Sequence, residues 1–257
     1  MDRRSFLKNA AIGAALATLP AGGEILARKR DKSSFEPRGK GFRLAENEIV
    51  LFTGDSITDG SRERKYYRLA NHIRALGNGY VQLTATRLNY LFPEKNLKIY
   101  NTGINGDTVP KLAARLETDC IKLKPSVISI LLGVNDFNVS FSATGRGDPA
   151  GFEHQYRDLL TRIREALPGV RFILGEPYAL KGSRDKIDAW YPEFESYPRV
   201  VRRLAEEFDA VFIPYRQIYA EAAAEVPPRH FSTDGVHPSL AGVRLMCDGW
   251  LSYVNPL

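Results

Sequence analysis

Five short apolar runs, separated by longer segments with helical spacing, restrict the fold of this chain more than any other feature. The runs at 49–52 and 127–132 are nearly continuous, which suits strands buried on both faces of a parallel sheet. Regular alternation with helices predicts a parallel sheet covered on both sides, and right-handed crossovers leave few topologies. The predicted strands are residues 49–52, 97–100, 127–132, 170–174 and 210–213.

The segments between these runs predict the covering helices. Apolar residues recur at roughly helical spacing, and Pro93 and Pro168 stand where two of the helices should end. The stretch 136–150 carries no such periodicity and is predicted to be a loop. The predicted helices are residues 80–91, 109–122, 152–167 and 239–253.

The net charge of +6 is concentrated at the N-terminus. Residues 1–40 hold nine Lys and Arg against four Asp and Glu, so residues 41–257 are almost neutral. The later residues therefore show no basic face for a polyanion, and we predict no nucleic-acid partner.

The basic N-terminus has the features of an export signal. Arg3 and Arg4 precede a short apolar stretch of small residues at 10–19, which is too short to span a bilayer needing ~20 residues. The pair of arginines followed by Phe-Leu-Lys resembles a bacterial twin-arginine signal. We therefore predict an export signal at 1–27, a flexible lead-in at 28–43 and one domain at 44–257, located in the periplasm or outside the cell without stable membrane insertion.

Two cysteines, Cys120 and Cys247, are too few for a disulfide framework. Both lie in apolar helical patterns, which predicts two buried thiols on opposite sides of the sheet.

Four polar blocks stand where an open α/β sheet carries its chemistry, just beyond the carboxyl ends of strands or before a helix. Gly-Asp-Ser follows the first run at 54–56, and Asn-Thr-Gly-Ile-Asn-Gly-Asp follows the second at 101–107. Gly-Val-Asn-Asp follows the third at 133–136, and Asp-Gly-Val-His-Pro precedes the last helix at 234–238. Each block alone is common, but the four in this order form a specific signal.

In this order the blocks resemble those of the SGNH, or GDSL-type, hydrolase family, over nearly all of residues 48–257. The resemblance implies an α/β fold, a flavodoxin-like three-layer α/β/α sandwich with a five-stranded parallel sheet. It also implies a serine esterase that resembles secreted carbohydrate esterases. The site residues it implies are Ser56 as nucleophile, His237 as general base, Asp234 as the partner of the imidazole, and Ser56, Gly106 and Asn135 as the oxyanion hole.

These residue types suit acyl transfer on chemical grounds as well. A serine hydroxyl is a weak nucleophile until an imidazole takes its proton, and a carboxylate must fix the imidazole tautomer. Backbone N–H groups of Ser56 and Gly106 and the Asn135 amide could stabilise the developing oxyanion. The alternatives are structural: Ser56 could cap a helix, His237 could begin one, and Asn135 could be a turn residue.

Two segments outside the blocks, 137–151 and 177–198, are candidates for the walls of the site. The second carries five aromatic residues, whose faces suit sugar rings but could equally pack the segment onto the sheet. It also carries many charges, which do not suit a long acyl chain. We therefore predict hydrolysis of short-chain acyl esters, most simply O-acetyl, on carbohydrate, with Asp55, Trp190 and Tyr191 as substrate-binding candidates.

Two other functions remain open at this stage. One is a thioesterase or lysophospholipase acting on longer acyl chains, and the other is a catalytically inactive carbohydrate-binding protein. The expected partner is a small-molecule or polysaccharide ester. No grouping of His, Cys, Asp or Glu has metal-ligand spacing, so we predict neither a metal nor a cofactor.

Overall fold

The computed structural model describes residues 38–39 and 41–254. The predicted export signal at 1–27 and most of the lead-in lie outside these residues. The described chain forms one parallel sheet in the order β2-β1-β3-β4-β5. This is the flavodoxin-like order, so the predicted fold class is confirmed. The strands are β1 (Ile49–Gly54), β2 (Lys98–Asn101), β3 (Val127–Leu131), β4 (Arg171–Gly175) and β5 (Val211–Ile213).

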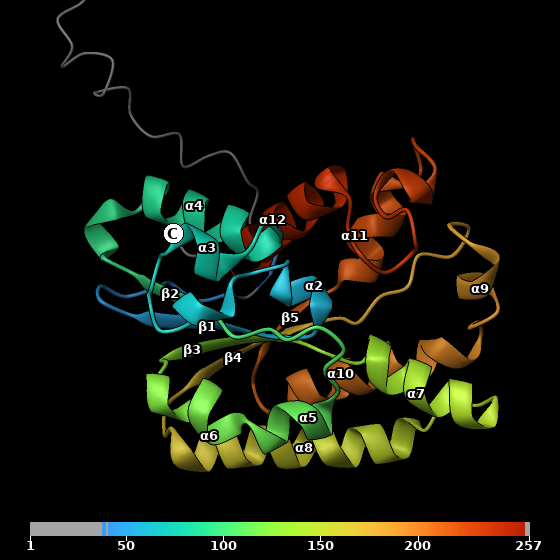
Figure 1. Ribbon diagram of the computed structural model, residues 1–257, viewed down its shortest axis with the longest axis horizontal. Coiled ribbons are helices and arrows are strands. Elements are labelled where there is room, and N and C mark those ends of the chain that lie inside the picture. Colours follow the sequence, from blue (N-terminus) through green and yellow to red (C-terminus); the bar gives the residue numbers. More distant parts are fainter. Residues whose placement is uncertain (1–37, 40, 255–257) are drawn as a thin grey trace, which may run out of the picture. The chain divides into compact units, whose positions relative to one another are not determined.

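Helices cover both faces of the sheet (Figure 1). On one face α12 packs against α4 and α11, and on the other α8 packs against α5 and α10. The α-helices are α2 (Ser56–Asp59), α3 (Ile73–Leu76), α4 (Tyr80–Leu91), α5 (Val109–Ala114), α6 (Leu116–Asp119), α7 (Val134–Thr144), α8 (Pro149–Ala166), α9 (Asp185–Asp188), α10 (Ser196–Glu207), α11 (Tyr215–Ala222) and α12 (Leu240–Val254). Short 3-10 turns are η1 (Arg64–Tyr66), η2 (Pro93–Lys95), η3 (Ile121–Leu123), η4 (Glu193–Glu195) and η5 (Pro228–His230).

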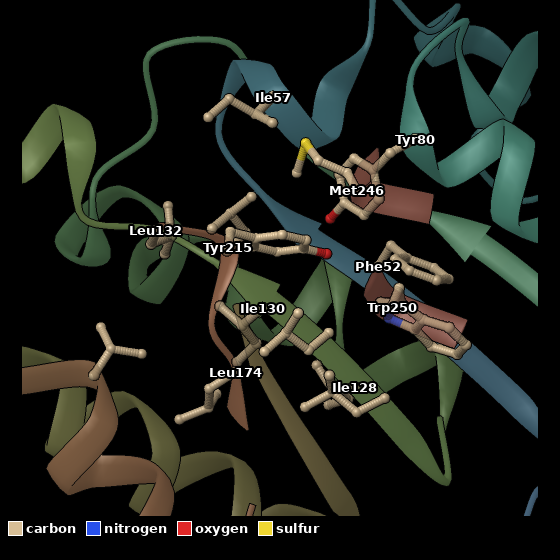
Figure 2. Packing of buried hydrophobic residues seen from close by; sticks show 14 of the residues in the cluster. Phe52, Ile57, Tyr80, Ile128, Ile130, Leu132, Leu174, Tyr215, Met246 and Trp250 are labelled. Carbon is tan, nitrogen blue, oxygen red and sulfur yellow. The ribbon is translucent and has the colours of Figure 1, made fainter. Parts of the chain in front are cut away.

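The two central strands are buried, as their apolar sequences require. Figure 2 shows Phe52 of β1 beside Trp250 of α12, and their ring centroids are 5.3 Å apart. The indole Nε1–H of Trp250 donates to Ser129 Oγ at 3.1 Å, so the one polar residue within β3 satisfies the one polar group of this ring. Each buried side chain of this size stabilises the fold by roughly 1.5–3 kcal/mol.

The prediction of a loop at 136–150 is wrong, because α7 occupies most of it and α8 begins at Pro149. The sequence of α7, VNDFNVSFSAT, contains few strong helix formers, so its local propensity gave no signal. Tertiary packing stabilises this helix instead. The buried Phe137 ring lies 5.2 Å from the ring of Trp190, which is distant in the sequence. It also lies 5.1 Å from Phe141 of the same helix, with both distances measured between ring centroids.

The helix predicted at 109–122 is interrupted. It consists of α5, α6 and η3, with non-helical backbone at Arg115 and Cys120. Arg115 bonds both Asp107 and Asp119 at this interruption, so ion pairs hold the bent segment together.

Residues just before 44 contact the domain. The Phe42 N–H donates to Val254 O at 2.8 Å, and the Arg38 N–H donates to Ser252 O at 2.9 Å. The Arg171 guanidinium lies 4.2 Å from the Phe42 ring centroid. These contacts put the start of the folded domain before the boundary predicted at 44. No helix within 38–39 and 41–254 is long and apolar enough to cross a bilayer.

Both cysteines are free and buried, as the sequence predicts. Cys120 follows α6 and Cys247 lies on α12, and these helices cover opposite faces of the sheet (Figure 1). Burial raises the pKa of the Cys120 thiol to about 12 and also raises the pKa of Cys247. We expect neither thiol to react with Ellman's reagent at pH 8 in the folded protein, and both to react in denaturant. Rapid reaction of either native thiol, or an intramolecular disulfide by mass spectrometry, would contradict this placement.

Candidate active site

The four polar blocks meet at one edge of the sheet. β1, β2 and β3 are neighbours and parallel, so the residues that follow them emerge side by side. Ser56 begins α2 after β1, Gly106 lies in the turn after β2, and Asn135 lies in the first turn of α7 after β3. The loop between η5 and α12 brings His237 to Ser56.

Ser56, His237 and Asp234 form a continuous hydrogen-bonded chain. Ser56 Oγ lies 2.8 Å from His237 Nε2, and His237 Nδ1 lies 2.6 Å from Asp234 Oδ2. With the carboxylate ionised, Nδ1 carries the proton and donates to Asp234. His237 Nε2 can then accept the hydroxyl proton of Ser56.

The other oxygen of Asp234 fixes the local turn. Asp234 Oδ1 accepts from the backbone N–H of His237 at 2.8 Å and of Val236 at 2.9 Å. Partial burial would raise the pKa of this carboxyl, but hydrogen bonds from the His237 ring and these two backbone groups lower it to about 2. Asp234 is therefore a carboxylate throughout the neutral range.

Three candidate donors, on Ser56, Gly106 and Asn135, follow three neighbouring strands at the same edge of the sheet. Asn135 Nδ2 donates one proton to Asp107 O at 3.0 Å, which fixes the amide and leaves its second proton available. Within the described residues, the backbone N–H groups of Ser56 and Gly106 have no acceptor. Gly106 has φ +77°, a left-handed conformation that favours glycine.

A close contact joins the serine turn to the turn after β2. A Cβ on Gly103 would lie 2.5 Å from the backbone N of Asp59, so only glycine permits this approach. The Asp59 carboxylate is buried and accepts from the Asn105 N–H at 3.0 Å. Arg62 Nε donates to Gly103 O at 2.8 Å. Neither Asp59 nor Arg62 belongs to a recognisable spacing pattern, so the sequence alone does not point to them.

A cavity of about 530 Å³ opens beside Ser56 and His237. Its walls come from the end of α2 and the residues after it, from the start of α4, from Asn105, and from the residues around the start of α12. The lining residues are Ser56, Ile57, Asp59, Gly60, Ser61, Arg64, Asn78, Gly79, Asn105, His237, Pro238 and Val243.

The three substrate-binding candidates do not line this cavity. Asp55 is 1% exposed, and its Oδ1 caps α2 by accepting from the Ile57 N–H at 2.9 Å. Trp190 is 5% exposed and packs on Phe137. Tyr191 donates from its hydroxyl to Ala179 O at 2.5 Å and lines a separate cavity of about 420 Å³. The aromatic residues at 190 and 191 thus pack their own segment.

Comparison with known proteins identifies relatives of this chain. The sequence profile of the GDSL-like lipase/acylhydrolase family matches residues 52–245. An acetylxylan esterase from Geobacillus stearothermophilus is 32% identical over 217 residues, covering 83% of this chain and 96% of the esterase. The chain belongs to the GDSL-like lipase/acylhydrolase family. It is a hydrolase of carboxylic ester bonds.

Solved structures of family members superpose on the fold. A protein from Parabacteroides merdae, described as a GDSL-like lipase, has a TM-score of 0.80 and 37% identity, covering 84% of this chain and 100% of that one. The Geobacillus esterase has a TM-score of 0.73 and 30% identity, covering 83% and 96%. Two structures of that esterase are described as catalytic mutants, one at a serine and one at a histidine.

In this GDSL-family hydrolase, Asp55 is a buried acid that directly precedes Ser56. Its Oδ2 has no hydrogen-bond partner within the described residues. Burial raises the pKa of Asp55 to about 7, although the Ile57 N–H bond lowers it, and the nearby Asp136 and Asp107 raise it further. The carboxyl is therefore partly protonated near neutral pH.

The raised pKa of Asp55 predicts a pH-dependent cost to stability. A carboxyl with a folded pKa near 7 and an ordinary value of 3.8 stabilises the fold fully below pH 3.8. That contribution is lost as the pH rises to 7. Asp55→Asn keeps the cap but cannot ionise, so from pH 5 to pH 8 it should gain roughly 2–3 kcal/mol in free energy of unfolding relative to the parent. Urea unfolding at both pH values measures this difference, and identical pH trends for the two proteins would contradict it.

The described residues contain no group of three His, Cys, Asp or Glu side chains that could hold a metal ion. The ion pairs near the site are carboxylate–guanidinium contacts, such as Asp107 with Arg115.

Proposed function

We propose that this hydrolase is a serine esterase that removes short acyl groups, chiefly O-acetyl, from carbohydrate through an acyl-enzyme intermediate. The observation that carries the proposal is the hydrogen-bonded chain from Ser56 Oγ through the His237 ring to Asp234, open to a polar cavity.

In the proposed mechanism Ser56 Oγ attacks the ester carbonyl while its proton moves to His237 Nε2. Asp234 stabilises the imidazolium, and the Asn135 amide with the Ser56 and Gly106 N–H groups stabilises the oxyanion. Collapse of the tetrahedral intermediate breaks the bond to the alcohol, and His237 returns the proton to the leaving alkoxide. Water then attacks the acyl-serine by the same route and releases the carboxylic acid.

Two observations support a carbohydrate acetyl ester. The relative with 32% identity over 83% of this chain is an acetylxylan esterase. The cavity beside Ser56 is lined by the polar side chains of Ser61, Asn78 and Asn105 among others, together with the apolar Ile57, Pro238 and Val243. The hydroxyl groups of a sugar would find hydrogen-bonding partners there.

Two assays test the proposal together. Acetylated xylo-oligosaccharides and other acetylated glycans should release acetate, and 4-nitrophenyl esters should show highest kcat/KM at acetyl with a steady fall towards octanoyl. An optimum at octanoyl or longer would favour a lipid or thioester substrate. Failure to react with a fluorophosphonate would favour a binding protein without catalysis.

A further inference from the structure

We infer that the cavity beside Ser56 binds the alcohol half of the ester, and that Arg64 there recognises the hydroxyl groups of an uncharged sugar. The inference rests on the proposed function and adds the place and chemistry of sugar recognition.

The position of His237 decides which half of the ester faces the cavity. The leaving alkoxide takes its proton from His237 Nε2, so the alcohol must lie on the imidazole side of Ser56. His237 and Pro238 form one wall of the cavity. Gly106 and Asn135, two of the three proposed oxyanion donors, are not among its lining residues, which directs the carbonyl oxygen away from the cavity. A volume of about 530 Å³ is within the usual range of small-molecule sites, roughly 300–1,000 Å³.

The residues that line the cavity suit hydrogen bonding to sugar hydroxyl groups rather than stacking against the face of a sugar ring. None of the described residues that line it is Phe, Tyr or Trp. Its polar side chains include Ser61, Arg64, Asn78 and Asn105, which offer donors and acceptors from three separate segments. A sugar would therefore be held by hydrogen bonds at its edges, and not by its face on a ring.

The Arg64 guanidinium is anchored by one hydrogen bond, and its other N–H donors remain available. Its Nη2 donates to Asp59 Oδ2 at 3.2 Å, the one hydrogen bond of this guanidinium within the described residues. The Arg64 side chain is 57% exposed, whereas Asp59 is 8% exposed and anchored by the Asn105 N–H. A guanidinium has five N–H donors in a rigid fork, so most remain available to adjacent sugar hydroxyls.

The ion pair between Arg64 and Asp59 also indicates which ligand charge the cavity favours. Arg64 and Asp59 are the charged residues among those that line the cavity, apart from any charge on His237, and they neutralise each other. Among the lining residues, no cation other than Arg64, which is paired with Asp59, would offset the charge of an anionic sugar. The cavity is therefore matched to a neutral glycosyl unit.

The test compares two acetate esters in the Arg64→Ala variant. A monoacetylated methyl xyloside offers hydroxyls to the cavity, whereas 4-nitrophenyl acetate has none and a leaving group that needs no proton. The ratio of kcat/KM for the sugar ester to that for the aryl ester should fall about tenfold to a hundredfold, the usual result of losing hydrogen bonds from a charged donor. The loss should appear mainly in KM, since these bonds form in the ground state.

Lys65→Ala is the matched control. Lys65 is the next residue of η1, its side chain is 65% exposed, and it pairs with Glu63 at 3.6 Å outside the cavity lining. Its removal changes the local charge equally but should leave the selectivity ratio unchanged.

Three results would overturn the inference. Parallel loss on both esters in Arg64→Ala would mean that Arg64 acts through Asp59 on the turn at Asn105 and not on the sugar. An unchanged ratio would remove Arg64 from recognition, and a parent preference for an acetylated uronate over the neutral xyloside would remove the charge argument. Failure of the proposed function differs from all three, because the parent enzyme would then cleave the aryl acetate and no sugar acetate.

Discussion

Ser56→Ala should lower ester hydrolysis by at least about 10⁴-fold, while the protein keeps its fold. The alanine lacks the oxygen that would bond to the acyl group, and removal of a nucleophile from a triad costs this much or more. The described hydrogen bond of this hydroxyl is the one to His237, and the cap on α2 comes from Asp55, so little packing is lost. The free energy of unfolding should change by less than about 1 kcal/mol.

Initial rates on 4-nitrophenyl acetate, with thermal melts of the same samples, measure both parts. Ser142→Ala is a matched control, because Ser142 is an exposed serine on α7 whose described side-chain bond reaches only Asn138. Retained activity in Ser56→Ala would remove the residue from the mechanism. Unfolding of the variant would mean that the serine is structural.

Asn135→Ala should lower kcat by about 10²–10³-fold with little change in KM. If the amide donates to the oxyanion, its bond strengthens only as negative charge develops in the transition state. The bond from Nδ2 to Asp107 O holds the amide in place before substrate arrives, so the donor needs no reorganisation. Steady-state kinetics on acetyl esters give kcat and KM separately.

The competing role of Asn135 is structural, as a tie between α7 and the turn after β2. Loss of such a tie should cost about 1 kcal/mol of stability and leave kcat within a few-fold of the parent. Asn138→Ala, three residues further along α7, removes an amide outside the site and provides the baseline for this helix. A stability loss without a kcat loss would restrict the oxyanion donors to Ser56 and Gly106.

The sequence was sufficient to predict elements whose formation depends mainly on the burial of apolar side chains. The strands at 49–52 and 127–132 were recognisable because burial on both faces demands apolar residues at successive positions, and parallel strands bring their ends to one edge. That topology brings Ser56 and Asn135 to the same edge, whereas His237 lies in the loop before α12 and was identified through the family resemblance. The helix α7 was missed because Phe137 stabilises it through contacts with rings distant in the sequence, such as Phe194, which no local pattern reveals.

The walls of the site were the least predictable part. The sequence shows that 177–198 is rich in aromatic residues, but it does not show the direction in which each ring points. Trp190, for example, is buried. Arg64 and Asp59 were overlooked because their roles depend on a fold that brings α2 against the turn at Asn105. Asp55 was recognised as part of a polar block, but the sequence does not show that its side chain is buried where β1 ends and α2 begins.

The contact of Gly103 with Asp59 packs the turn that carries Ser56 directly against the turn that carries Gly106. Displacement of one turn would therefore disturb the other, and the proposed mechanism needs no closure over the substrate to assemble the reacting groups. The wall at Asn78 belongs to the same packed unit, because the Asn78 N–H donates to Gly60 O at 2.8 Å and a Cβ on Gly77 would lie 2.7 Å from Asp59 O. Transplanting 54–64 or 101–107 singly into another scaffold should therefore separate parts of the proposed site that are held together by this packing.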